Sequence, residues 1–130
     1  MAGEFSTIDK LSQAMTFHRE RHAVLAGNIA NVDTPGYRPY DITQESAPSD
    51  LPLATTESGE TLQPDGAPGA AYAQTFDDGG QLAGPDGNAV SMERELAKID
   101  ANRTRYATAA DLVSRRMAIL KYAAGDGSGG

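Results

Sequence analysis

The chain has 130 residues and a formal net charge of −7, and it lacks cysteine, which excludes disulfides, thiol catalysis and cysteine metal sites. With 14 glycines, 7 prolines and no tryptophan, it is poor material for a single packed globule. Residues 41–90 contain nine acidic residues and no lysine or arginine, so we expect no nucleic-acid partner.

Residues 6–32 repeat apolar or histidine side chains every three or four positions, which predicts an amphipathic helix about 40 Å long. Ser6 is a suitable N-cap, and Pro35 ends the pattern because it disfavours helical backbone in the residue before it. Pro35 and Gly36 fit a type II turn, in which Gly36 takes a positive φ. The residues expected to pack against another helix are Ile8, Leu11, Met15, His22, Leu25 and Ile29.

The segment 33–90 begins with this turn and continues as an acidic middle rich in proline and glycine. Its apolar residues follow no period, so we expect loop or a disordered insert, with at most one or two short strands. The best candidates for strands are residues 70–76 and 88–90.

Residues 91–124 repeat the three-and-four spacing and predict a second helix, about 50 Å long. Gly125 is a natural residue to follow a helix end, and residues 125–130 are expected to form a flexible tail. The residues expected at the helix interface are Leu96, Ile99, Tyr106, Val113, Met117 and Leu120.

The predicted fold is mainly α, with the two long terminal helices packed as a coiled-coil-like pair around an irregular middle. The two apolar faces are buried either within the chain or against other subunits. A second set of apolar residues, which includes Leu112 and Ile119, widens the face of the last helix and favours burial against neighbours.

The segment 25–37 combines small residues, which permit close helix approach, with two asparagines and the Pro-Gly turn. On the residues alone it is a helix end followed by a turn. It resembles the N-terminal signature of flagellar rod, hook and hook-associated proteins. The resemblance assigns an assembly role to Asn28, Ala30, Asn31, Asp33, Thr34, Pro35, Gly36 and Tyr37.

The segment 86–95, followed by Asn102, Tyr106 and residues 114–117, is similar to the flagellar basal-body rod family and most like its proximal rod type. This resemblance implies a structural subunit that polymerises through its terminal helices and transmits torque in the periplasmic part of the bacterial flagellum basal body. It also implies export by the flagellar type III apparatus. The implied partners are other copies of the chain, other flagellar rod proteins, the rod-base adaptor, and membrane-ring and export-gate components.

Two further features of the sequence concern targeting and membranes. The first ten residues show no basic segment followed by an apolar run, so we expect no cleaved signal peptide. No stretch approaches the roughly 18 apolar residues of a transmembrane helix, so we expect no direct membrane span.

Two other functions are open on the sequence. The chain could be a helical export adaptor or chaperone of the secretion system, which would bind its partner transiently. It could also be a small metalloenzyme, because His18 and His22 are spaced to share one helix face and bind zinc. No third ligand is evident and Glu20 lies on a different side of the helix, so we expect no enzyme activity, metal or cofactor.

Overall fold

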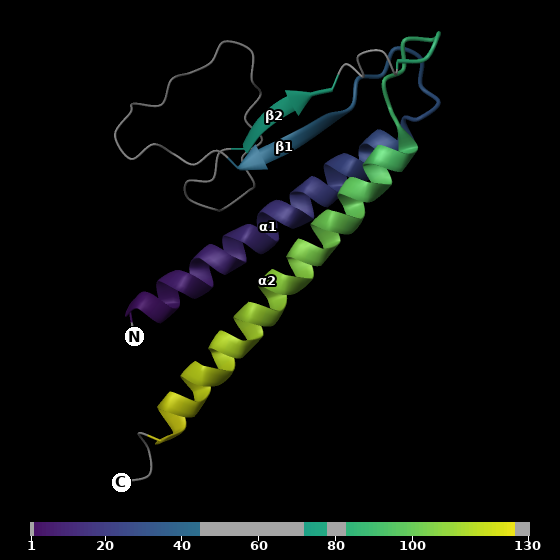
Figure 1. Cartoon of the computed structure of the whole chain (residues 1–130). Coiled ribbons are helices and arrows are strands. Elements are labelled where there is room, and N and C mark those ends of the chain that lie inside the picture. The colour runs from purple at the N-terminus through teal and green to yellow at the C-terminus, as the bar shows by residue number, and fades with distance from the viewer. Residues whose placement is uncertain (1, 45–71, 78–82, 127–130) are drawn as a thin grey trace, which may run out of the picture.

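The computed structural model describes residues 2–44, 72–77 and 83–126. The elements follow the chain as α1 (Ala2–Ala30), β1 (Tyr40–Gln44), β2 (Tyr72–Phe76) and α2 (Met92–Asp126). Helices α1 and α2 lie side by side and antiparallel, while the two strands pack beside α1, and α2 extends beyond the start of α1 (Figure 1). The prediction of a mainly α fold built on two packed terminal helices is confirmed.

Helix α1 begins earlier, and helix α2 ends later, than the sequence pattern indicated. Helix α1 begins at Ala2 instead of Ser6, because Glu4 suits the positive end of the helix and is held by a two-bond ion pair to Arg116 of α2, with distances of 2.8 and 2.7 Å. Helix α2 continues through Gly125 to Asp126, so the expected helix end before Gly125 is wrong. The rest of the expected flexible tail, residues 127–130, lies outside the described residues.

At its C-terminal end, α1 stops at Ala30, two residues before the predicted end. The backbone tightens there, since the amides of Asn31 and Val32 donate to carbonyls only three residues back, at 3.1 Å each. Tight last turns of this kind satisfy carbonyls that a regular helix would leave free.

The two strands form an antiparallel ladder in which Tyr40 lies opposite Phe76 and Gln44 opposite Tyr72. Strand β2 matches the segment expected near residues 70–76, whereas β1 was not predicted. The other candidate, residues 88–90, is not a strand: there the side chain of Asn88, and not a ladder, makes most of the contacts. Residues 45–71 and 78–82, most of the predicted irregular middle, lie outside the described residues.

The hairpin is held to α1 by a small apolar core. Phe17 of α1, Ile42 of β1 and Tyr72 of β2 are buried together, and Val24 and Tyr40 pack against them. The rings of Phe17 and Tyr72 lie 5.2 Å apart in a tilted arrangement. Within the described residues, no helix is apolar over a long enough stretch to cross a membrane.

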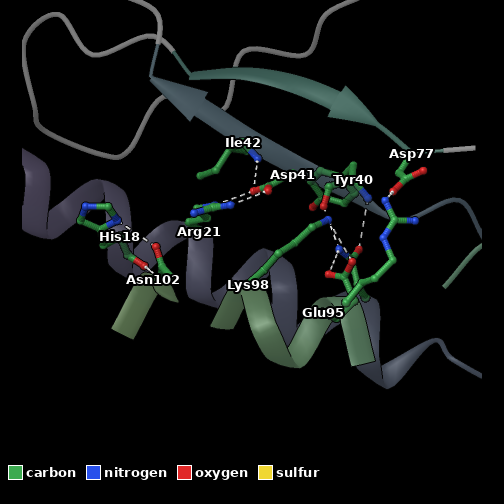
Figure 2. A network of polar contacts seen from close by, with 11 residues as sticks. His18, Arg21, Tyr40, Asp41, Ile42, Asp77, Glu95, Lys98 and Asn102 are labelled. Carbon is green, nitrogen blue, oxygen red and sulfur yellow. Dashed lines mark hydrogen bonds and ion pairs between the residues drawn. The ribbon is translucent and has the colours of Figure 1, made fainter. Parts of the chain in front are cut away.

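An ion pair reinforces this attachment. Arg21 of α1 donates to both carboxylate oxygens of Asp41 in β1 at 2.8 and 2.7 Å, and Asp41 also accepts the amide of Ile42 at 2.8 Å (Figure 2). Burial raises the pKa of Asp41, but the hydrogen bonds and charge of Arg21 outweigh it and hold that pKa below its ordinary value.

The lowered pKa makes the contribution of Asp41 sensitive to acid. Its stabilisation is present above the unfolded-state pKa of about 3.9 and is lost as the pH falls through the lower folded-state value. Replacing Asp41 with asparagine should therefore lower the urea midpoint at pH 7 and flatten its decline below pH 5, measured by circular dichroism. Asp111→Asn is the matched control, because its ion pair with Arg115 is exposed and should contribute little. Identical pH profiles for the two variants would contradict this account.

Candidate assembly site at the end of the helix pair

The residues that follow α1 form a compact turn, here called the exit turn (residues 31–37). The Asn31 amide group donates to the carbonyl of Gly27 at 2.8 Å, and its backbone carbonyl accepts the amide of Thr34 at 3.0 Å. The amide of Tyr37 then donates to the carbonyl of Thr34 at 3.2 Å, and Gly36 has a φ of 73°. The positive φ predicted for Gly36 is confirmed, and the bond closes a type II turn.

A second segment, the return loop (residues 83–90), lies against the exit turn. The amide of Gly36 donates to the carbonyl of Asp86 at 3.0 Å, and the amide of Ala89 donates to the carbonyl of Tyr37 at 3.1 Å. Gly87 has a φ of 76°, and a β-carbon there would lie 3.6 Å from the Cα of Gly36. The two segments are therefore packed backbone against backbone.

The side chain of Asn88 joins the same two segments. Its Nδ2 lies 3.0 Å from the carbonyl oxygen of Asn31, 2.9 Å from that of Val32 and 2.7 Å from that of Thr34. Its Oδ1 accepts the amide of Val90 at 2.8 Å. Asn88 is buried, so these are the contacts that satisfy its amide group.

Beneath the exit turn lies a fully buried side chain, Asn28, with a relative exposure of 0%. Its Nδ2 donates to the carbonyl of Tyr40 at 2.8 Å and to Oε2 of Glu95 at 2.9 Å. Its Oδ1 accepts the hydroxyl of Tyr37 at 3.1 Å and the amide of Tyr40 at 3.3 Å. Asn28 thus connects the last turn of α1 with the exit turn, β1 and α2. These contacts of Asn28 with Tyr37, Tyr40 and Glu95, together with Lys98, are here called the junction.

Glu95, Lys98 and Tyr37 are ionisable residues around Asn28. The buried carboxylate of Glu95 receives a second hydrogen bond from Lys98, at 3.1 Å (Figure 2). Burial raises the pKa of Tyr37, which keeps its hydroxyl protonated as the donor to Asn28. Within the described residues every buried side-chain nitrogen and oxygen has a partner. A network satisfied in this way specifies one arrangement of its members.

A second polar contact lies further along the helix pair. The Nδ1 of His18 lies 2.8 Å from Oδ1 of Asn102, and Nδ2 of Asn102 donates to the carbonyl of His18 at 2.6 Å (Figure 2). His22 is exposed instead. Among the described residues, no group of three or more histidines and carboxylates is arranged to hold a metal.

The structure brings the predicted motif residues together at one end of the helix pair, with Asn28 buried and Asp33 to Gly36 exposed. The predicted interface residues divide into three groups by their exposure within this chain. Ile8 and Leu25 are buried; Leu11, Met15, Ile29, Ile99, Val113 and Leu120 are half-buried; and His22, Leu96, Tyr106 and Met117 are exposed.

The sequence pattern did not indicate three buried polar residues: Asn88 and Glu95 at this site, and Asn102 further along the helix pair. Glu95, Asn102 and the buried Ala109 are spaced by seven residues, which is the repeat of a helix seam. That seven-residue spacing could have identified the seam. A search for apolar side chains alone, however, misses Glu95 and Asn102.

The family described as "Flagella basal body rod protein" matches residues 9–38. The flagellar basal body rod protein FlgB of Aquifex aeolicus is 35% identical over 104 residues, which cover 80% of this chain and 81% of the relative. FlgB of Escherichia coli is 34% identical over 121 residues, covering 76% and 83%. FlgB of Aeromonas hydrophila is 32% identical over 122 residues, covering 87% and 89%.

Proposed function

This chain belongs to the flagella basal body rod protein family, and from that premise we propose that it is a structural subunit of the proximal part of the flagellar rod. In this role it polymerises through its terminal helices and transmits torque without chemistry. The matched region begins within α1 and ends just after the exit turn, so it includes the buried Asn28 and the turn itself.

The observation that carries this proposal is the number of large apolar side chains that α2 leaves uncovered. Helix α2 has 35 residues against 29 in α1, and its last turns extend beyond the start of α1 (Figure 1). Burying one such side chain contributes about 1.5–3 kcal/mol, which favours packing against neighbours. The exposed large apolar residues of α2 are Met92, Leu96, Tyr106, Leu112, Met117, Ile119 and Tyr122.

We further propose that the protein is not an enzyme and takes no cofactor. The polar side chains at the candidate site are committed to one another and to backbone groups, as in the Asn28–Glu95 contact. Such an arrangement holds segments in place, which suits a structural role.

The finer parts of the proposal concern partners and location. We propose that other copies of the chain, other rod proteins, the rod-base adaptor, and ring and export-gate components contact these faces in the periplasmic rod. Export through the flagellar type III apparatus would bring the chain there. Fractionation tests the whole proposal, because a rod subunit stays in purified basal bodies whereas a transient secretion adaptor does not.

A single change on the uncovered face should separate assembly from folding. Ile119 is exposed within the chain, so Ile119→Asp should leave helix content unchanged. In a dry interface the same carboxylate costs several kcal/mol. Basal-body incorporation should fall at least about tenfold, and motility should be lost. The Ile119→Met variant, which keeps an apolar side chain, should assemble normally. Normal swimming by the aspartate variant would show that this face is not an interface.

A further inference from the structure

The exit turn is not held by its own residues alone. The carbonyl groups after a helix end need donors, and these commonly come from a nearby glycine-based cap or from water. Here the carbonyls of Asn31, Val32 and Thr34 lie within 3.0 Å of the same Asn88 nitrogen, and those of Asn31 and Thr34 also accept backbone amides of the exit turn. An amide group has two hydrogens, so the three acceptors share them.

Asn88 is itself fixed from both sides. Its backbone amide donates to Oδ1 of Asp86 at 3.1 Å, and its backbone carbonyl accepts the amide of Gly84 at 3.0 Å. Its Oδ1 is occupied by the amide of Val90. The return loop therefore orients the side chain so that its donor hydrogens, and not its oxygen, face the exit turn.

We propose that Asn88 is a positioning residue that gives the exit turn its shape from the other half of the chain. This inference goes beyond the proposed function, because it concerns the folded chain whether or not the chain is a rod subunit. The backbone bonds from Gly36 to Asp86 and from Ala89 to Tyr37 lie on either side of it. The exit turn and the return loop are accordingly one unit, although more than 50 residues separate Asn88 from its partners.

The consequence is that the surface at this end of the helix pair is composite. The exit turn contributes the exposed residues Asp33, Pro35 and Gly36, and the return loop contributes the exposed Pro85 and Asp86. A chain whose C-terminal half has not reached the exit turn keeps the local bonds from Thr34 to Asn31 and from Tyr37 to Thr34, but lacks the Asn88 amide group that joins the three carbonyls. The composite surface therefore acquires its final shape only once the return loop has reached the exit turn.

The Asn88→Asp variant tests the donor role, because a carboxylate has nearly the same shape but can only accept. It would face three carbonyl oxygens and the negative end of α1. Amide hydrogen exchange on the full chain is the measurement, with Gly36, Tyr37 and Ala89 as reporters and amides in the middle of α1 as the internal reference. At pH 7 the reporters should exchange at least about tenfold faster, while the reference changes much less.

The pH provides a readout that a purely structural role would not move. A protonated carboxyl can donate one hydrogen, so the protection lost in Asn88→Asp should partly return near pH 4. The matched control is Gln44→Glu, an amide-to-acid change at an exposed position, which should alter neither the reporters nor their pH dependence. If Asn88→Asp does not fold, Asn88→Ala decides, with the same reporters and a smaller acceleration.

Any one of four results would overturn the inference. Unchanged reporters in Asn88→Asp or in Asn88→Ala would show that the amide group is not the donor that matters. Acceleration that is equal in the reporters and in α1 would indicate general destabilisation instead of positioning. Unprotected reporters in the unmodified chain, or a pH response equal to that of Gln44→Glu, would also overturn it.

Discussion

The Asn28→Asp variant is expected to unfold at a much lower urea concentration than the unmodified chain. The Nδ2 of Asn28 donates to Oε2 of Glu95 at 2.9 Å and to the carbonyl of Tyr40 at 2.8 Å in a fully buried position. A carboxylate cannot donate, so both bonds are lost and two like charges face each other out of water. Leaving a buried charge without its partner costs about 3–5 kcal/mol, a large part of the stability of a small domain.

The effect should depend on pH with a defined sign. Two carboxyl groups in one buried site cannot both ionise easily, so in this variant the pKa of one of them is raised on folding. A raised folded-state pKa means that stability is retained below the unfolded value of about 4 and is lost as the pH increases. The deficit of Asn28→Asp relative to the unmodified chain should therefore shrink on going from pH 7 to pH 4.

A second change separates the interaction from a general loss of packing. Glu95→Gln in the Asn28→Asp background restores one donor and one acceptor across the same contact and removes one of the two charges. The double variant should regain a substantial part of the lost urea midpoint, even though the ion pair between Glu95 and Lys98 is gone. If the double variant is no more stable than Asn28→Asp, the like-charge explanation fails.

The same junction explains why the sequence predicted the two helices better than the residues at which they contact each other. The three-and-four spacing identified both long helices, because each buries one face along its length. In α2, however, part of the seam lies one residue earlier than predicted. Glu95 and Asn102 are buried, whereas Leu96 and Met117 are each 52% exposed. An apolar pattern selects Leu96 over its polar neighbour, and only tertiary partners such as Asn28 and His18 make burial of the polar residue favourable.

The exit turn could be predicted from the sequence, but the return loop and strand β1 that lie beside it could not. Pro35 and Gly36 act through local backbone preferences, which one sequence reveals. The contacts of Asn88 join residues more than 50 positions apart, and β1 depends on pairing with β2 and packing on Phe17. Such long-range contacts leave no periodic signal. Whether exposed residues such as Leu96 are buried by neighbouring subunits remains a prediction.

Replacing Gly36 with valine is expected to block incorporation into the rod while export of the subunit continues. Gly36 has a φ of 73°, which a β-branched residue adopts only with strain. Nothing lies within 4 Å of the position a β-carbon would take, so the penalty for adding that carbon is conformational and not a clash. It amounts to about 1–2 kcal/mol, and more for valine than for alanine.

Gly27 provides a matched control within the same motif. A β-carbon there also meets nothing within 4 Å, but Gly27 lies inside α1 with helical backbone. Gly27→Ala should thus stabilise the chain by about 0.5–1 kcal/mol, whereas Gly36→Ala should destabilise it. Opposite signs for two glycine-to-alanine changes with equal free space would isolate the backbone angle as the cause.

The effect of Gly36→Val on assembly should exceed its effect on stability. The exit turn directs the chain from α1 into β1, and the amide of Gly36 is bonded to the return loop through the carbonyl of Asp86. In a helical assembly an error in that direction is repeated at every subunit, so one flexible loop cannot absorb it. Immunoblots of secreted and basal-body fractions should show the Gly36→Val subunit outside the rod and the Gly27→Ala subunit within it. If the Gly36→Val subunit enters the rod as efficiently as the unmodified subunit, then assembly does not depend on the geometry of the exit turn.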